Sequence, residues 1–129
     1  MDEKLGKSYK LCSRKSIDQL FKDGRQLRSY PFTVYFAPIS NSEKKAFQLV
    51  FSAPKRSFKR AHDRNYIKRL MKEAFRKQKH ALETIIDAQQ QQWAFFIIYN
   101  QRELPKYLEI EKNTSKMILK LTAEITEIK

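Results

Sequence analysis

The chain of 129 residues carries 27 Lys and Arg against 14 Asp and Glu, a formal net charge of +13, with 41% hydrophobic and 12% aromatic residues. This length suits one domain with its own hydrophobic core, which we expect over residues 1–129, and the apolar content excludes an intrinsically disordered chain. A charge of this size predicts a polyanionic partner, for which nucleic acid is the first candidate and an anionic membrane surface the second.

Several other classes of protein are disfavoured by the sequence. The longest apolar run, Trp93–Tyr99, has the length of a strand and falls far short of the roughly 18 residues of a spanning helix. The N-terminus lacks the apolar core of a signal peptide, so we expect a cytoplasmic protein. Cys12, His62 and His80 have no metal-site spacing, and two glycines in the whole chain exclude a Gly-rich phosphate loop.

The first predicted element is a short helix over residues 13–24. Its apolar residues recur at helical spacing, which places Ile17 and Phe21 on one face, and Gly24 is the predicted stop.

Two strands are predicted next, around residues 31–38 and 46–54. In the first, Phe32, Val34 and Phe36 alternate with Thr33 and Tyr35, so Tyr35 points away from the three apolar side chains. In the second strand, the residues that alternate with Gln48, Val50 and Ser52 are the apolar Phe47, Leu49 and Phe51. Because the polar run SNSEKK separates the two strands, we expect them to form a hairpin.

A buried strand over Trp93–Tyr99 and a helix after Pro105 complete the chain. The helix carries an apolar stripe of Ile118, Leu121, Ile125 and Ile128. The order of elements, with helices on one face of a small sheet, predicts an α+β sandwich of two layers.

Between the strands lies a strongly basic segment, residues 55–79, with eleven Lys and Arg and two acidic residues, a net +9 of the total +13. On a helical wheel, one arc is apolar: Ile67, Leu70, Met71, Ala74 and Phe75. A neighbouring arc is predicted to be polar and basic: Arg64, Asn65, Lys68, Arg69, Lys72, Arg76 and Lys79. Like charges four residues apart destabilise an isolated helix, so their retention favours a bound polyanion.

Three other interpretations of this segment compete with nucleic-acid binding. A solvated helix face usually mixes charges of both signs, whereas here only Glu73 is placed to pair with the cations. A basic amphipathic helix on a membrane surface is a further alternative. Acid–base catalysis is disfavoured, because His62 and Asp63 point about 100° apart on a helix.

The run KRSFKRAHDRNYIKRLMKEAF resembles the signature of the protein subunit of bacterial ribonuclease P, in which K-R-x-F-x-K/R-A is followed by R-N-R and I-K-R. Thirteen positions carry the resemblance: Lys55, Arg56, Phe58, Arg60, Ala61, Arg64, Asn65, Ile67, Lys68, Arg69, Leu70, Ala74 and Phe75. The sequence departs from the signature at Tyr66, where the third position of R-N-R is basic, and at Lys59, where glycine is common. The wheel places Tyr66 at the margin of the basic face.

The resemblance implies a fold like the second domain of ribosomal protein S5, with about four strands and three helices in the order α-β-β-β-α-β-α. One more strand is therefore expected near residues 25–30. The implied activity is endonucleolytic removal of the 5′ leader from precursor tRNA, with magnesium ions bound by the catalytic RNA, and neither a catalytic residue nor a cofactor in the protein itself. The implied partners are that RNA and precursor tRNA, with no membrane and no small-molecule substrate.

Two sets of site residues are carried over from the family. The RNA-contacting set is Lys55, Arg56, Arg60, Arg64, Asn65, Lys68 and Arg69. The cleft for the single-stranded leader involves Ile17, Phe21 and Tyr35, although burial in the core is an equal alternative for the first two. A ribosomal or ribosome-assembly RNA-binding protein is the main alternative function, because such a protein shares the basic helix but has no use for a stacking cleft.

Overall fold

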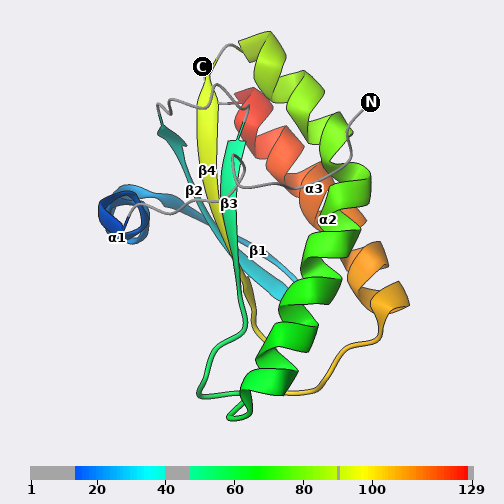
Figure 1. The fold of residues 1–129 in the computed structure, drawn as a ribbon. Coiled ribbons are helices and arrows are strands. Elements are labelled where there is room, and N and C mark those ends of the chain that lie inside the picture. The colour runs from blue at the N-terminus through cyan, green and yellow to red at the C-terminus, as the bar shows by residue number, and fades with distance from the viewer. Residues whose placement is uncertain (1–13, 40–46, 90, 128–129) are drawn as a thin grey trace.

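The computed structural model describes residues 14–39, 47–89 and 91–127. The elements follow in the order α1 (Arg14–Asp23), β1 (Arg25–Ser29), β2 (Phe32–Ile39), β3 (Phe47–Ser52), α2 (Ala61–Gln89), β4 (Gln92–Tyr99) and α3 (Tyr107–Glu127). This order and the four strands confirm the predicted α+β fold (Figure 1). The additional strand expected near residues 25–30 is β1.

The four strands form one mixed sheet in the order β1-β2-β4-β3. β2 is antiparallel to both β1 and β4, and β3 is parallel to β4. The predicted hairpin of β2 with β3 is therefore wrong, because β4 lies between them. β4 carries apolar side chains on both faces, and such a strand is best buried between two neighbours. The hairpin of this sheet is β1–β2, which turns at a cis Tyr30–Pro31 peptide.

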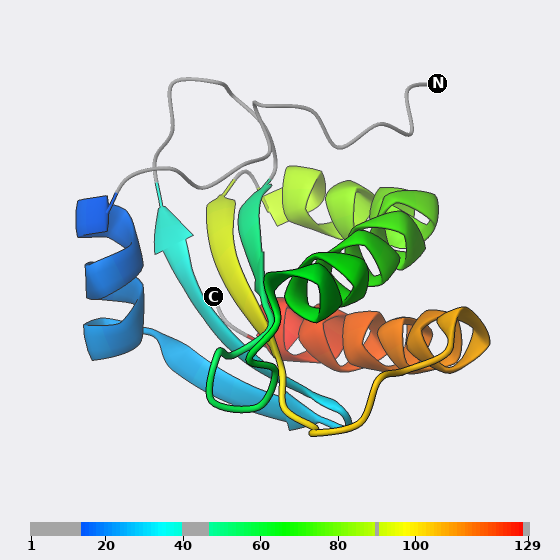
Figure 2. The ribbon, with the colours of Figure 1, turned by 60° about the horizontal axis from the view of Figure 1, so that its bottom comes forward.

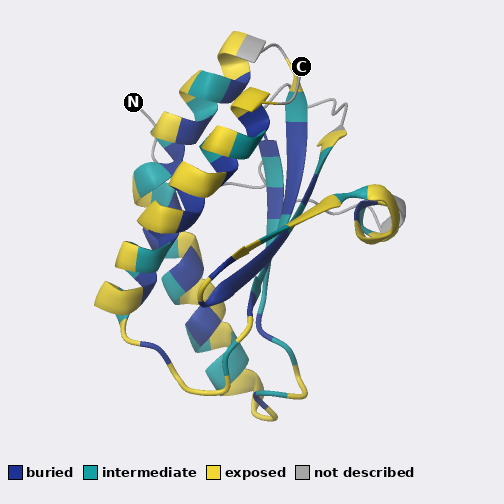
Figure 3. Cartoon of the chain, turned by 180° about the vertical axis from the view of Figure 1, so that it is seen from behind, coloured by how far each residue is buried: buried dark blue, intermediate teal, exposed yellow. Residues whose placement is uncertain are grey.

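The main core lies between the sheet and the pair α2 and α3, which cover the same face (Figures 1 and 2). Its centre is aromatic: the ring of Phe47 lies 5.6 Å from that of Phe75 and 5.8 Å from that of Phe95, measured between centroids. Residues of α2 and α3 that face the sheet are mostly buried, and those on the outer side are mostly exposed (Figure 3). This pair of layers matches the predicted sandwich.

α1 differs from the expected arrangement, because it packs on the opposite face of the sheet (Figure 2). Its buried Leu20 contacts Ala94 of β4, with half-buried apolar side chains around them. The helix ends at Gly24 as predicted, where the amide donates to the carbonyl of Leu20 at 2.9 Å. A Cβ at Gly24 would lie 2.2 Å from that same oxygen, so a residue with a side chain fits only if the backbone shifts.

α3 uses the apolar stripe predicted for it. Ile118, Leu121 and Ile125 are buried in the main core, while Ile128 lies outside the described residues. Among the helices of the described ranges, none is long and apolar enough to cross a membrane.

Candidate nucleic-acid interface

The connection between β3 and α2, residues 53–60, is an anchored loop that exposes four cations. The carbonyl of Pro54 accepts hydrogen bonds from the amides of Ser57 and Phe58, both at 3.1 Å. The Phe58 ring is 5% exposed and lies 6.0 Å from the ring of Tyr99. With the backbone held by a turn and an aromatic anchor, the outward residues are Lys55, Arg56, Lys59 and Arg60.

The first half of α2 continues this positively charged surface. Ile67, Met71, Ala74 and Phe75 are buried and Leu70 is half-buried, as the wheel predicted. On the outer side, the exposed residues are Asn65, Lys68, Arg69 and Lys72. Together with the four loop cations, these residues are called the basic surface below. Six of the seven predicted RNA-contacting residues belong to it, and Arg64 is the seventh.

The basic face is shorter than the wheel predicted. Lys79 is only 1% exposed, so its assignment to the exposed charged face is wrong. It stands four residues after Phe75 and three before Leu82, which are both fully buried, and therefore lies on the apolar stripe of the helix. Its Nζ is 3.9 Å from Oε1 of Glu83.

Arg76 is also less available than expected, because it forms a two-point ion pair with Glu73. Nε donates to Oε2 at 3.0 Å and Nη2 donates to Oε1. The hydrogen bond from Arg76 lowers the pKa of Glu73 from its ordinary value. The Glu73 carboxylate therefore offsets part of the Arg76 charge, whereas Lys68, Arg69 and Lys72 are exposed nearer the N-terminus of α2.

Arg64 differs from the other predicted contact residues, since it is half-buried. Its Nη1 donates to the carbonyl of Phe58 at 2.8 Å and to that of Lys59 at 2.9 Å. The side chain thus reaches back from the first turns of α2 to the loop that precedes the helix.

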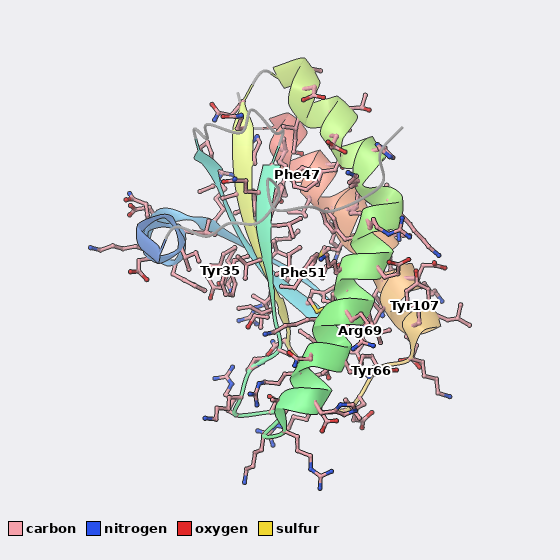
Figure 4. All side chains as sticks on the ribbon, in the orientation of Figure 1. Tyr35, Phe47, Phe51, Tyr66, Arg69 and Tyr107 are labelled. Carbon is pink, nitrogen blue, oxygen red and sulfur yellow. The ribbon has the colours of Figure 1, made fainter. Side chains whose placement is uncertain are left out.

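The wheel predicts Tyr66 at the margin of the basic face, and in the structure its side chain is directed to the core. Its half-buried ring packs against the main core, and its hydroxyl donates to the carbonyl of Pro105 at 3.4 Å. Figure 4 shows Tyr66 toward the connection that leads into α3.

The predicted leader residues meet on the α1 side of the sheet, where Ile17 and Tyr35 pack against the Leu20–Ala94 contact. Phe21 is 43% exposed, and its ring stands edge-on to those of Tyr35 at 4.8 Å and Phe96 at 4.7 Å between centroids. Tyr35 lies on the opposite side of the sheet from Phe47 and Phe51 (Figure 4). Phe21, Tyr35 and Phe96 are called the aromatic cluster below.

Phe96 was missed by the sequence reasoning, although a signal was present. In β4 the side chains at 93, 95, 97 and 99 are buried and those at 96 and 98 are half-buried, so the strand alternates. The run from Trp93 to Tyr99 is apolar throughout, so the sequence predicted a strand buried on both faces. The alternation in burial was therefore not recognised.

A metal centre is not formed by the described part of the chain, where no three His, Cys, Asp or Glu residues gather in a possible binding group.

Comparison with known proteins agrees with this arrangement. The family model described as Ribonuclease P matches residues 5–122. The ribonuclease P protein component of Porphyromonas gingivalis is 28% identical over 121 residues, which cover 94% of this chain and 88% of the relative. The RNase P protein of Staphylococcus aureus has a similar fold, with a TM-score of 0.66, 23% identity and coverage of 88% of this chain and 94% of that one. The RNase P protein from Thermotoga maritima gives a TM-score of 0.65 at 19% identity, with coverage of 84% and 94%. With 118 of 129 residues inside the family match, the chain belongs to the ribonuclease P protein family.

Proposed function

We propose that this chain is the RNA-binding protein subunit of ribonuclease P, which assists a catalytic RNA in removing the 5′ leader from precursor tRNA in the cytoplasm. The observation that carries the proposal is the presence of two chemically different surfaces on one small domain. The basic surface lies on the β3–α2 loop and α2, and the aromatic cluster lies on the face of the sheet under α1.

In this proposal the basic surface binds the RNA subunit. Arg56, Arg60 and Arg69 can each present two parallel N–H donors to a phosphate, whereas Lys55 and Lys68 supply less directional charge. The side-chain amide of Asn65 can donate to a phosphate or bridge to a 2′-hydroxyl. These residues are exposed, so their polar groups need no rearrangement of the core to reach the RNA.

The aromatic cluster, together with Ile17, is assigned to the single-stranded leader. Aromatic faces stack on unpaired bases without selecting one base, which suits an enzyme that processes many leaders. Phe21 is the most accessible ring of the cluster, and the edge-on contacts with Tyr35 and Phe96 hold it in place.

The chemistry is assigned to magnesium ions bound by the RNA subunit, and the protein contributes by lowering the electrostatic cost of bringing two RNAs together. Polyanions repel each other most when few divalent cations are present. The protein is therefore expected to matter most at low magnesium concentration.

Reconstitution with the cognate catalytic RNA tests this function. At limiting magnesium, addition of the protein should accelerate cleavage of a precursor tRNA transcript, and no gain would overturn the assignment. Photo-crosslinking from position 21 or 35 separates this function from a role in the ribosome. Crosslinks to the 5′ leader support the proposal, and crosslinks to ribosomal RNA alone contradict it.

A further inference from the structure

We infer that Arg64 supports RNA binding as a positioning residue, by holding the β3–α2 loop in shape, and not through a phosphate contact of its own. The inference rests on the proposed function, because it concerns how the basic surface is organised for RNA. It departs from the role that the R-N-R signature implies for this residue.

The first observation is the bonding of one nitrogen of the Arg64 guanidinium. Nη1 donates to two successive carbonyls, those of Phe58 at 2.8 Å and Lys59 at 2.9 Å. Hydrogen bonds from a charged donor are stronger than those between neutral groups. The other six predicted contact residues are exposed, and Arg64 is the one that is half-buried against the chain.

The second observation is the position of these carbonyls within the loop. Upstream, the loop is fixed by the carbonyl of Pro54, which accepts from the amides of Ser57 and Phe58. In the middle it is fixed by the buried Phe58 ring. At the remaining end, where the chain passes from Phe58 into α2, the Arg64 side chain adds to the backbone bonds in which the carbonyl of Arg60 accepts from the amides of Asp63 and Arg64.

The third observation is the charge that the loop must hold together. Lys55, Arg56, Lys59 and Arg60 lie within six residues, with no acidic residue among positions 53–60. Four like charges favour an expanded loop when no RNA is bound. Arg64 adds a fifth positive charge beside them, and its hydrogen bonds to the two carbonyls offset this added repulsion.

A loop that is ordered before binding avoids an entropic cost during binding. Ordering the backbone of a single additional residue at that moment lowers affinity by roughly 5- to 30-fold. Loss of the Arg64 hydrogen bonds should therefore weaken RNA binding while the same phosphates are still contacted in the complex.

A double-mutant cycle tests the inference, with the cognate catalytic RNA as the probe. Arg64→Ala is compared in the natural background and in a background where Lys55, Arg56, Lys59 and Arg60 are all replaced by Ala. We expect Arg64→Ala to weaken binding about tenfold in the first background and less than twofold in the second. An equal loss in both backgrounds overturns the inference, because Arg64 would then act without the loop.

Salt dependence and proteolysis supply two further readouts. A direct phosphate contact at Arg64 would flatten the slope of log affinity against log salt by about 0.7 to 0.9 in the Ala variant, whereas a positioning residue leaves the slope unchanged. Native-state trypsin cleavage within residues 55–60 should be faster in Arg64→Ala than in the control Lys68→Ala, and equal rates contradict the inference. Arg64→Met, which keeps the aliphatic stem, replaces the Ala variant if that variant fails to fold.

Failure of this inference can be told apart from failure of the proposed function. If the fourfold loop variant binds the catalytic RNA as tightly as the natural chain, the loop is not part of the interface and the proposed role of the basic surface fails. If the fourfold variant binds weakly but Arg64→Ala is additive with it, only the role of Arg64 is wrong.

Discussion

Tyr66 occupies the position where the family signature has a third basic residue, and its surroundings explain what it does there. The half-buried ring packs against the main core, and the hydroxyl reaches the carbonyl of Pro105 just before α3. A side chain in this place links α2 to the β4–α3 connection. The absence of charge at position 66 is therefore expected to cost the basic surface little.

Replacement of Tyr66 by Ala should lower the free energy of unfolding by about 1–3 kcal/mol, because a half-buried aromatic ring is removed from the edge of the core. Affinity for the catalytic RNA should change by less than about twofold, a difference of roughly 0.4 kcal/mol. Urea unfolding and filter binding measure the two effects. Tyr66→Phe is the matched control and should stay within about 0.5 kcal/mol, since it loses only a long hydrogen bond. A stable Ala variant with weak RNA binding would place Tyr66 in the interface.

Tyr99 gives the protein a predicted sensitivity to alkaline pH. The side chain is 4% exposed and its hydroxyl donates to the carbonyl of Glu103 at 2.8 Å. Burial, the largest cause, raises the pKa of Tyr99 from 10.0 to about 12. The unfolded chain therefore loses this proton at lower pH than the folded chain, so stability is fully present below pH 10.0 and is lost as the pH rises toward about 12.

The loss from Tyr99 should amount to at most about 2.7 kcal/mol, since each pKa unit corresponds to about 1.36 kcal/mol. Tyr99→Phe should flatten the decline in the free energy of unfolding above pH 10.0, measured by urea unfolding at successive pH values. Some decline should remain, because burial also raises the pKa of Tyr107. An unchanged decline in Tyr99→Phe would contradict the assignment.

At the scale of elements, α2 has an electrostatic polarity along its length. The loop and the helix as far as Lys79 hold eleven Lys and Arg and two acidic residues, whereas residues 80–89 hold Glu83 and Asp87 and no Lys or Arg. RNA is therefore expected to follow the N-terminal half of the helix.

The number of phosphates bound there can be measured. If about five are neutralised, log affinity for the catalytic RNA against log salt should slope by about −3.5 to −4.5. Lys68→Ala and Arg69→Ala should each flatten the slope by about 0.7 to 0.9 and change the free energy of unfolding by less than about 0.5 kcal/mol. Lys112→Ala, an exposed lysine on α3, is the matched control and should leave the slope unchanged. A slope near zero for the natural chain would contradict an electrostatic interface.

The position of Phe21 on α1, beside Tyr35 and Phe96 of the sheet, allows a test of the proposed contact with the leader. Phe21→Ala should reduce the preference for precursor tRNA over mature tRNA by about tenfold, because stacking on an aromatic ring contributes about 1–3 kcal/mol per base. Competition binding to the reconstituted complex measures this preference. Leu119→Ala removes another exposed apolar side chain, which lies on α3, and should leave the preference unchanged. Equal losses in the two variants would indicate a general effect of stability.

The helices and strands could be predicted from the sequence more accurately than the order in which the strands pair in the sheet. Alternation identified Phe47, Leu49 and Phe51 as the core side of β3, because side-chain direction is a local property of a strand. The insertion of β4 between β2 and β3 depends on contacts between residues far apart in the chain, which no local pattern encodes. The same limit applies to the aromatic cluster. Phe21 and Tyr35 could be predicted as site residues from the sequence, whereas Phe96 lies beside them only because β4 pairs with β2 in the sheet.

Helix patterns also gave side-chain direction only approximately. The wheel separated Lys68 from Met71 correctly, but it placed Lys79 outside an apolar stripe that is wider in the structure. It likewise gave no indication that Arg64 turns back to the carbonyls of Phe58 and Lys59. Replacement of Arg64 should therefore reduce stability as well as RNA affinity, unlike that of Lys68.

For the whole molecule, the charge is concentrated on one part of the domain. Residues 55–79 carry +9 of the net +13, whereas residues 106–127 hold four lysines and four glutamates and are neutral. Helix α3 itself holds three lysines and four glutamates and so nearly balances its charges, whereas the loop with the first half of α2 does not. The free protein is expected to be destabilised by repulsion within the basic surface until RNA or salt compensates it.

Salt should therefore act in opposite directions on the stability of the free protein and on its affinity for RNA. Raising NaCl from about 50 mM to about 500 mM shortens the screening length from roughly 14 Å to roughly 4 Å, which weakens repulsion between exposed cations. We expect the melting temperature of the free protein to rise by a few degrees over this range while RNA affinity falls. The variant with Lys55, Arg56, Lys59 and Arg60 replaced by Ala separates this effect from the general influence of salt on hydrophobic burial, because it keeps the core and removes four of the repelling charges. Its melting temperature should rise less with NaCl than that of the natural chain. An equal rise in melting temperature would mean that repulsion among the loop cations does not destabilise the free protein. The loop would then need no partner to compensate this repulsion.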